Sequence, residues 1–250
     1  MKIAIAGAGG RMGRTLIEAV LADHELELAA ALEVAGSPAV GTEIGKTKVT
    51  SDAGMVALAD VLIDFTRPEG TLAHLKHARA MVIGTTGLSD AQRKAVAEAA
   101  RRIPIVMAAN FAVGVNALYK LAETAARILG DDYDVEIVEA HHRHKVDAPS
   151  GTALRLGEII ASVFKQSDFV FGRKSETGER PVRQVGYHSI RGGDIVGEHT
   201  VIFAGTGERV EVTVRSQSRM TYALGALRAA KWLKGRPPGL YGMEDVLGLK

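Results

Sequence analysis

Near its start the chain reads Ile3-Ala4-Ile5-Ala6-Gly7-Ala8-Gly9-Gly10-Arg11-Met12-Gly13, and this stretch decides the fold of its first part. The apolar run is typical of a buried strand, and the following segment, Met12–Leu21, carries apolar side chains at helical spacing. Glycines between a strand and a helix let a phosphate approach the backbone, and the helix N-terminus offers free N–H groups and a positive dipole end. The stretch therefore predicts a strand–loop–helix unit that binds a dinucleotide.

The glycine spacing is G-x-x-G-x-x-G rather than the strict G-x-G-x-x-G form. The loop residues that we assign to the cofactor are Gly7, Gly10, Arg11, Met12 and Gly13. Glu33 ends the second apolar run about 20 residues further on, where an acidic side chain accepts hydrogen bonds from the adenosine ribose. The alternative is a glycine turn that joins a strand to a helix and binds no ligand.

The rest of the first part alternates short apolar runs with longer amphipathic stretches. The further runs that read as buried strands are Leu26–Leu32, Val61–Phe65, Met81–Ile83 and Ile103–Met107. Helices are predicted over Pro68–Arg79 and Ser89–Arg101, because proline suits a first helical position and Ser89 suits an N-cap. This alternation predicts an α/β fold whose N-terminal domain is Rossmann-type, with a parallel sheet covered on both faces.

Three further loops follow predicted strands, at the edge of a parallel sheet where a dinucleotide lies. Small and hydroxyl side chains there would let the nicotinamide and its ribose lie against the sheet edge. The residues of these loops that we assign to cofactor binding are Arg67, Gly84, Thr85, Thr86, Ala108, Asn110 and Phe111.

After Gly114 the pattern changes to one that predicts an α+β C-terminal domain with an open mixed sheet. The predicted helices are Val115–Leu129, Ser150–Phe164 and Met220–Leu233, and the predicted strands are Val135–Ala140, Gln184–Ile190, Asp194–Phe203 and Glu208–Ser216. The segment Lys165–Arg183 is rich in charged residues, glycine and serine, so we expect a mobile surface loop there.

Composition excludes several classes of protein and site. The 250 residues carry a net charge of only +2 without a basic stripe, which argues against a nucleic-acid partner. The absence of cysteine excludes disulfides, thiolate metal sites and a cysteine nucleophile. No run of about 18 apolar residues occurs, and the apolar start is too short for a signal peptide. We therefore expect a cytoplasmic protein without a membrane partner.

The most informative segment is Glu139-Ala140-His141-His142-Arg143-His144-Lys145-Val146-Asp147-Ala148-Pro149-Ser150-Gly151-Thr152. Ser150 suits the N-cap of the next helix, and the N–H groups of Gly151 and Thr152 would form an anion site. With Lys145 and a nearby histidine, the segment predicts a clamp for a carboxylate or dicarboxylate, with proton donors beside it. The alternatives are a zinc site built from the three histidines and a solvated basic loop.

With these residues in view, the sequence resembles the dihydrodipicolinate reductase family over nearly its whole length. The motif just quoted, extended to Ala153, carries the resemblance most specifically. The other matching stretches are Phe65-Thr66-Arg67-Pro68-Glu69, Gly84-Thr85-Thr86-Gly87, Asn110-Phe111 and Gly193-Asp194-Ile195-Val196-Gly197-Glu198-His199.

The resemblance implies NADH- or NADPH-dependent reduction of 4-hydroxy-tetrahydrodipicolinate (dihydrodipicolinate), a cyclic imine acid, to tetrahydrodipicolinate in diaminopimelate and lysine biosynthesis. It implies His141 as a catalytic proton donor or acceptor and Lys145 as the proton donor. The residues assigned to substrate binding are His142, Ser150, Gly151 and Thr152. No metal is implied.

The resemblance also implies a homotetramer joined through the sheet of the second domain. Its domain boundaries are residues 1–112 with 219–250 for dinucleotide binding, and 113–218 for substrate binding and oligomerisation. Hinges near residues 112 and 219 would let the cleft close.

Cofactor preference follows from the residue after Glu33. An adenosine 2′-phosphate needs a cation there, and members of the family that use NADPH well often carry arginine, but residue 34 is valine. Arg11 could partly replace that cation, and we expect NADH to be well accepted. The competing functions are another nicotinamide reductase, such as one acting on a semialdehyde, and a dinucleotide-binding redox sensor without catalysis.

Overall fold

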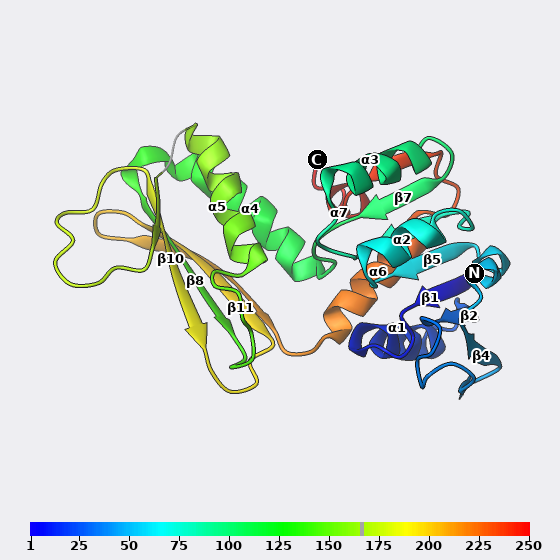
Figure 1. Ribbon diagram of the computed structural model, residues 1–250. Coiled ribbons are helices and arrows are strands. Elements are labelled where there is room, and N and C mark those ends of the chain that lie inside the picture. Colours follow the sequence, from blue (N-terminus) through cyan, green and yellow to red (C-terminus); the bar gives the residue numbers. More distant parts are fainter. Residues whose placement is uncertain (166–167) are drawn as a thin grey trace. The chain divides into compact units, whose positions relative to one another are not determined.

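The computed structural model describes residues 1–165 and 168–250, which divide into two compact units (Figure 1). The N-terminal unit comprises Met1–Val113 together with Arg219–Lys250, and the second unit comprises Gly114–Ser218. Each unit has a sheet and a hydrophobic core of its own.

The N-terminal unit is built on a sheet in the order β13-β7-β6-β5-β1-β2-β4-β3. The strands are β1 (Lys2–Ala6), β2 (Glu27–Leu32), β3 (Glu43–Ile44), β4 (Thr47–Thr50), β5 (Val61–Asp64), β6 (Met81–Ile83), β7 (Pro104–Met107) and β13 (Gly239–Tyr241). Every pairing is parallel except that of β3 with β4 at one edge. The Rossmann-type parallel sheet predicted from the sequence is thus confirmed.

Helices cover both faces of this sheet. They are α1 (Arg11–Ala22), α2 (Pro68–His74), α3 (Asp90–Ala99), α6 (Met220–Trp232) and α7 (Met243–Leu247), with the 3-10 helix η1 (Ala53–Leu58). Alternate residues of β1 enter two different cores: Ile3 and Ile5 pack with α1 and α6, whereas Ala4 packs with α3 and η1. Burial on both faces explains why the central strands read as continuous apolar runs.

Helix starts in this unit agree with the sequence. Pro68 is the first residue of α2, and Ser89 caps α3 in a capping box with Gln92. The predicted end of α2 at Arg79 is wrong, because the helix ends at His74 and the chain then turns to bring the buried Met81 into the sheet.

The second unit has a five-stranded mixed sheet in the order β12-β11-β8-β10-β9. The strands are β8 (Asp134–His141), β9 (Asp168–Phe171), β10 (Gln184–Arg191), β11 (Gly197–Ala204) and β12 (Arg209–Ser216). β8 pairs in parallel with β10 and antiparallel with β11. Helices α4 (Val113–Leu129) and α5 (Gly151–Phe164) pack against the sheet in one core, and η2 (Gly130–Asp132) follows α4.

Part of the predicted mobile loop Lys165–Arg183 is a strand. β9 pairs in parallel with β10, and Phe171 stacks on Tyr187 with ring centroids 5.1 Å apart. The apolar run of β9 is short and is flanked by charged residues, so its composition is typical of a loop. Pairing with β10 stabilises it as a strand. Gln166 and Ser167 of the predicted loop lie outside the described residues.

No helix formed by residues 1–165 or 168–250 is long and apolar enough to cross a membrane.

Candidate functional site

The glycine loop of the N-terminal unit is shaped by close backbone contacts. Gly7 has φ +78°, in the left-handed region that favours glycine, and its carbonyl accepts a hydrogen bond from Gly10 N at 2.9 Å. A Cβ on Gly13 would lie 1.9 Å from Gly7 O. Helix α1 starts directly after Gly10, which gives no side-chain cap. The N–H groups of the first turn are therefore left for an anion such as a phosphate.

Glu33 lies against this loop, as the sequence predicts for a ribose-binding carboxylate. Its Oε2 accepts a hydrogen bond from Gly9 N at 2.8 Å, and its Oε1 accepts one from Val34 N at 2.9 Å. Residue 9 must be small, because a Cβ there would lie 2.9 Å from the same carboxylate oxygen. The backbone path and the carboxylate thus fit a dinucleotide. Val34 is 71% exposed and offers no charge.

The loops after β5 and β6 are joined by a buried carboxylate. Asp64 is fully buried and accepts hydrogen bonds from Thr66 N at 2.9 Å, Thr66 Oγ1 at 2.6 Å and Thr85 Oγ1 at 3.2 Å. His74 Nδ1 lies 2.7 Å from its other oxygen. Asp64 therefore connects two of the loops assigned to the cofactor. Sequence reasoning missed it, although an aspartate that ends an apolar strand is an available signal.

The other residues assigned to the cofactor follow the same edge of parallel strands. Arg67 and Thr86 are exposed, and Gly84 must be glycine, because a Cβ would lie 2.3 Å from the Phe65 ring. Phe111 is only 1% exposed and packs on Phe65, with ring centroids 5.4 Å apart. Its ring therefore belongs to the core. Partly buried Ala108 and Asn110 precede it, and Asn110 Oδ1 accepts a hydrogen bond from Ala112 N.

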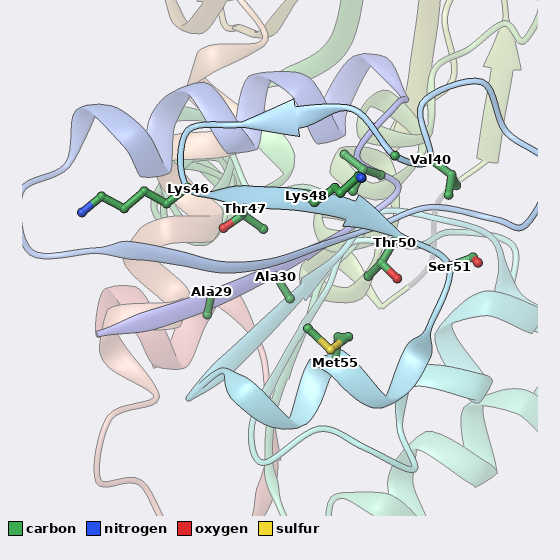
Figure 2. A pocket seen from close by; sticks show the side chains of 11 residues that line it. Ala29, Ala30, Val40, Lys46, Thr47, Lys48, Thr50, Ser51 and Met55 are labelled. Atoms are coloured by element: carbon green, nitrogen blue, oxygen red, sulfur yellow. The ribbon is translucent and has the colours of Figure 1, made fainter.

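A cavity of ≈ 500 Å³ lies along β2, β4 and η1 in the N-terminal unit (Figure 2). Lys46 and Lys48 are exposed, and Figure 2 shows Lys46 extending away from the other labelled side chains. We assign no chemistry to this cavity.

In the second unit, the predicted histidine segment begins at Glu139, within the last residues of β8, and continues through the turn to α5. Glu139, only 1% exposed, accepts two hydrogen bonds from Arg191, at 2.9 and 2.7 Å. His141 Nδ1 lies 2.6 Å from Glu139 Oε2. His141 is thus attached to an ion pair between buried Glu139 and partly exposed Arg191, which brings together residues far apart in the sequence. Sequence reasoning missed both partners; Glu139 opens the quoted segment, but nothing marks Arg191.

Ser150 acts as the N-cap of α5, as predicted. Its Oγ accepts a hydrogen bond from Ala153 N at 3.2 Å and lies 2.9 Å from His199 Nε2. Ser150 is only 3% exposed, so its hydroxyl is used inside the protein. The residue at the start of α5 that is accessible to a ligand is Gly151. It is exposed, and a Cβ added to it would have no other atom within 4 Å. Thr152 follows it in the first turn, where its side chain hydrogen-bonds Tyr119.

Lys145 lies on the turn between β8 and α5. Its Nζ is 2.8 Å from Asp147 Oδ1, and its backbone N–H donates to His142 O at 3.1 Å. The Lys145 side chain is 21% exposed. Among the residues that the structure describes, none hydrogen-bonds the buried Nδ1 of His142. The second unit therefore brings His141, His142 and Lys145 together with the start of α5.

In this region the buried carboxylate is ionised, whereas burial disfavours the charged form of the histidines. Burial alone would raise the pKa of Glu139, but hydrogen bonds, chiefly from Arg191, outweigh it and lower that pKa to about 2. Burial lowers the pKa of His141 and takes the pKa of His199 down to about 4. Near neutral pH both histidines are therefore neutral, and the basic side chains whose charge acts on His141 are Lys145 and Arg191.

The zinc alternative finds no support in the geometry. Within residues 1–165 and 168–250, no group of three histidine, aspartate or glutamate side chains is placed to hold a metal ion. What the region offers instead is a helix N-terminus with an exposed first residue, a partly exposed ammonium group and a neutral imidazole. These groups suit the binding of a carboxylate and the movement of a proton beside it.

Comparison with known families assigns both units. Residues 1–111 match the family described as "Dihydrodipicolinate reductase, N-terminus", and residues 114–247 match "Dihydrodipicolinate reductase, C-terminus". A protein of Aromatoleum aromaticum named 4-hydroxy-tetrahydrodipicolinate reductase is 56% identical, covering 100% of this chain and 96% of its own length. A protein of the same name from Cupriavidus necator is also 56% identical, with both chains fully covered.

A solved structure of the same family is also similar to this chain. The dipicolinate-bound dihydrodipicolinate reductase of Paenisporosarcina sp. TG-14 is similar with a TM-score of 0.82 and 27% identity, covering 98% of each chain. An aspartate semialdehyde dehydrogenase of Vibrio cholerae is similar in fold alone, with a TM-score of 0.53 and 10% identity over 92% of this chain and 97% of its own. The chain belongs to the dihydrodipicolinate reductase family.

Proposed function

We propose that this chain reduces 4-hydroxy-tetrahydrodipicolinate to tetrahydrodipicolinate with a nicotinamide cofactor, a step of diaminopimelate and lysine biosynthesis. The observation that carries the proposal is the full-length similarity, at 56% identity, to proteins named for this reaction. The dipicolinate in the related structure is a planar dicarboxylate, which agrees with a substrate of that class.

The two units have different roles in this proposal. The N-terminal unit, residues 1–113 with 219–250, holds the dinucleotide through its glycine loop, Glu33 and the loops joined by Asp64. The second unit, residues 114–218, holds the substrate. When bound, the cofactor supplies a hydride, and the protein supplies position and a proton.

The residues of the second unit bind the substrate and supply the proton. Gly151 and Thr152 bind a substrate carboxylate at the start of α5, and His142 adds a contact to it. The 4-hydroxyl of the substrate leaves as water, the resulting conjugated imine takes up the hydride that the cofactor would supply, and Lys145 delivers the proton that balances this hydride, because an ammonium group carries protons to donate. His141, neutral and bonded through Nδ1 to Glu139, offers its other nitrogen to the substrate.

Product analysis separates this function from its competitors. With NADH deuterated at the transferable position and freshly made substrate, we expect tetrahydrodipicolinate that carries a single deuterium. Aspartate semialdehyde is expected to give no turnover. Turnover of the semialdehyde, or cofactor binding without turnover of either compound, would favour the semialdehyde reductase or the redox sensor instead.

Cofactor preference depends on the position after Glu33. We expect NADH to be well accepted, because Val34 offers no cation to an adenosine 2′-phosphate. Val34→Arg is expected to raise kcat/KM for NADPH about tenfold, the change that about 1.4 kcal/mol gives, and to leave NADH nearly unaffected. Val34→Gln is the matched neutral control. A KM for NADPH far below that for NADH in the unaltered protein would contradict this assignment.

We also propose a homotetramer that buries the sheet face of the second unit opposite α4 and α5. Ile190 of β10 is 51% exposed, whereas its neighbours on the helix side, such as Tyr187, are buried. Light scattering should give a mass of four times the 26.5 kDa chain. Ile190→Glu is expected to reduce that mass, and Ile128→Glu, at a 76% exposed position on α4, is not. A monomer for the unaltered protein would refute the tetramer.

A further inference from the structure

The environment of Glu139 is unusual for a carboxylate. It is almost completely buried, each of its oxygens accepts at least two hydrogen bonds, and the side chain of Ser189 also hydrogen-bonds it. Oε1 accepts from Arg191 Nη2 at 2.7 Å and from Ser150 N at 3.2 Å. Oε2 lies 2.9 Å from Arg191 Nη1 and 2.6 Å from His141 Nδ1. An ionised carboxylate can only accept hydrogen bonds, so each of these partners must be a donor.

This requirement determines the position of the proton on His141. Because Nδ1 must donate to Glu139, the neutral imidazole carries its proton on Nδ1 and a lone pair on Nε2. The titratable and charged groups that act on the ring are Glu139, Lys145, Arg191 and His199. Glu139 is the acid among them and the only one bonded to the ring nitrogen.

Arg191 extends the same contact to the segment that carries Lys145. Besides its two bonds to Glu139, its Nη2 donates to Asp147 O at 2.6 Å. Asp147 in turn binds the Lys145 ammonium. Ser150, whose backbone N–H donates to Glu139, is the N-cap of α5. The Glu139–Arg191 ion pair therefore contacts the end of β8, the turn after it and the residue just before the proposed carboxylate site.

We propose that Glu139 and Arg191 are positioning residues for the reaction: they hold His141 in the Nδ1–H form and fix the turn that presents Lys145 and the start of α5. Neither residue needs to touch the substrate. The effect on turnover rests on the proposed function, but the position of the His141 proton does not, because it belongs to the free protein.

Glu139→Gln tests the pair, because an amide has one oxygen and one NH2 group. If the NH2 group replaces Oε2, it loses the bond from Arg191 Nη1, and it can bond His141 only by donating, which reverses the tautomer. If it replaces Oε1, it faces two donors, Arg191 and Ser150 N. Loss of the charge also removes a contribution that raises the pKa of His141, so that pKa should fall further. Glu139→Asp, which keeps the charge, should restore part of the unaltered behaviour.

NMR of the histidine ring nitrogens in the free protein reads both properties directly. For the unaltered protein we expect a protonated Nδ1 and an unprotonated Nε2 at His141. Glu139→Gln should shift the tautomer or lower the pKa of His141, and reduce kcat about 10- to 100-fold with little change in KM for the cofactor. Glu136→Gln is the matched control, since Glu136 lies on the same strand, is likewise paired with arginine (Arg173 and Arg180) and also has a pKa of about 2. It should leave the His141 tautomer and pKa unchanged.

A proton on Nε2 of His141 in the unaltered protein would overturn the proposal without any variant. Unchanged tautomer, pKa and kcat in Glu139→Gln would overturn it as well. Absence of turnover in the unaltered protein would instead refute the proposed function, and the NMR measurement would still decide the role of Glu139.

Discussion

Lys145→Ala is expected to lower kcat about 100-fold or more, the contribution typical of a positioned proton donor. The Lys145 ammonium group is partly exposed and held 2.8 Å from Asp147, on the turn that leads to the proposed carboxylate site. His141 has a lowered pKa and is neutral near neutral pH, so it cannot replace the lost acid. Steady-state rates with saturating cofactor measure the effect.

Two further variants separate proton transfer from charge. Lys145→Arg keeps the positive charge, but a guanidinium does not release its proton near neutral pH. It should therefore retain substrate binding and remain slow. Lys94→Ala, at an exposed position of α3, should behave as the unaltered protein. An unchanged kcat in Lys145→Ala would remove Lys145 from the mechanism.

Gly13→Ala is expected to destabilise the N-terminal unit by about 3 kcal/mol and to weaken dinucleotide binding. The new methyl group would lie 1.9 Å from Gly7 O and 2.7 Å from Gly7 C, so the glycine loop and α1 would have to separate. That separation moves the N–H groups that are proposed to bind the phosphates. Urea unfolding measures the stability, and calorimetry with NADH measures the binding.

Arg14→Ala provides the matched control, because Arg14 is the next residue of α1 and its side chain is exposed. It should leave both stability and NADH affinity nearly unchanged. If Gly13→Ala unfolded at the same urea concentration as the unaltered protein and bound NADH equally well, the close approach of α1 to the loop would not be a requirement of the fold.

The central architecture could be predicted because local signals and tertiary packing agree there. The continuous apolar run at Ile3–Ala6, the glycines after it and the amphipathic helix each require the same strand–loop–helix arrangement. Helix starts at Pro68 and Ser89 were visible for the same reason, since their capping chemistry is local.

Of the four edge strands, β12 was predicted and the other three were not. β3, β9 and β13 are short and lie at the margins, where little apolar surface is buried and the hydrophobic pattern is weak. The C-terminal tail contains β13, which pairs with β7 from the first part of the chain. Such pairing depends on a partner strand that is distant in the sequence, so no local sequence pattern predicts it.

The candidate site divides in the same way. His141, Lys145 and Ser150 lie in one segment, so their types and spacing could be interpreted directly. The groups that bind them lie elsewhere in the sequence. Arg191 on β10 and His199 on β11 contact Glu139 and Ser150 only because these strands pair with β8 in the sheet. The same holds for His74 on α2, which meets Asp64 of β5.

The most direct test of the central claim is the initial rate of NADH and NADPH oxidation, followed by the loss of their near-ultraviolet absorbance, with substrate generated freshly by the preceding synthase. We predict oxidation that depends on the synthase product and stops when the synthase is omitted. Binding of the cofactor, seen as quenching of Trp232 fluorescence, without any oxidation would contradict the assignment of the second unit to this substrate.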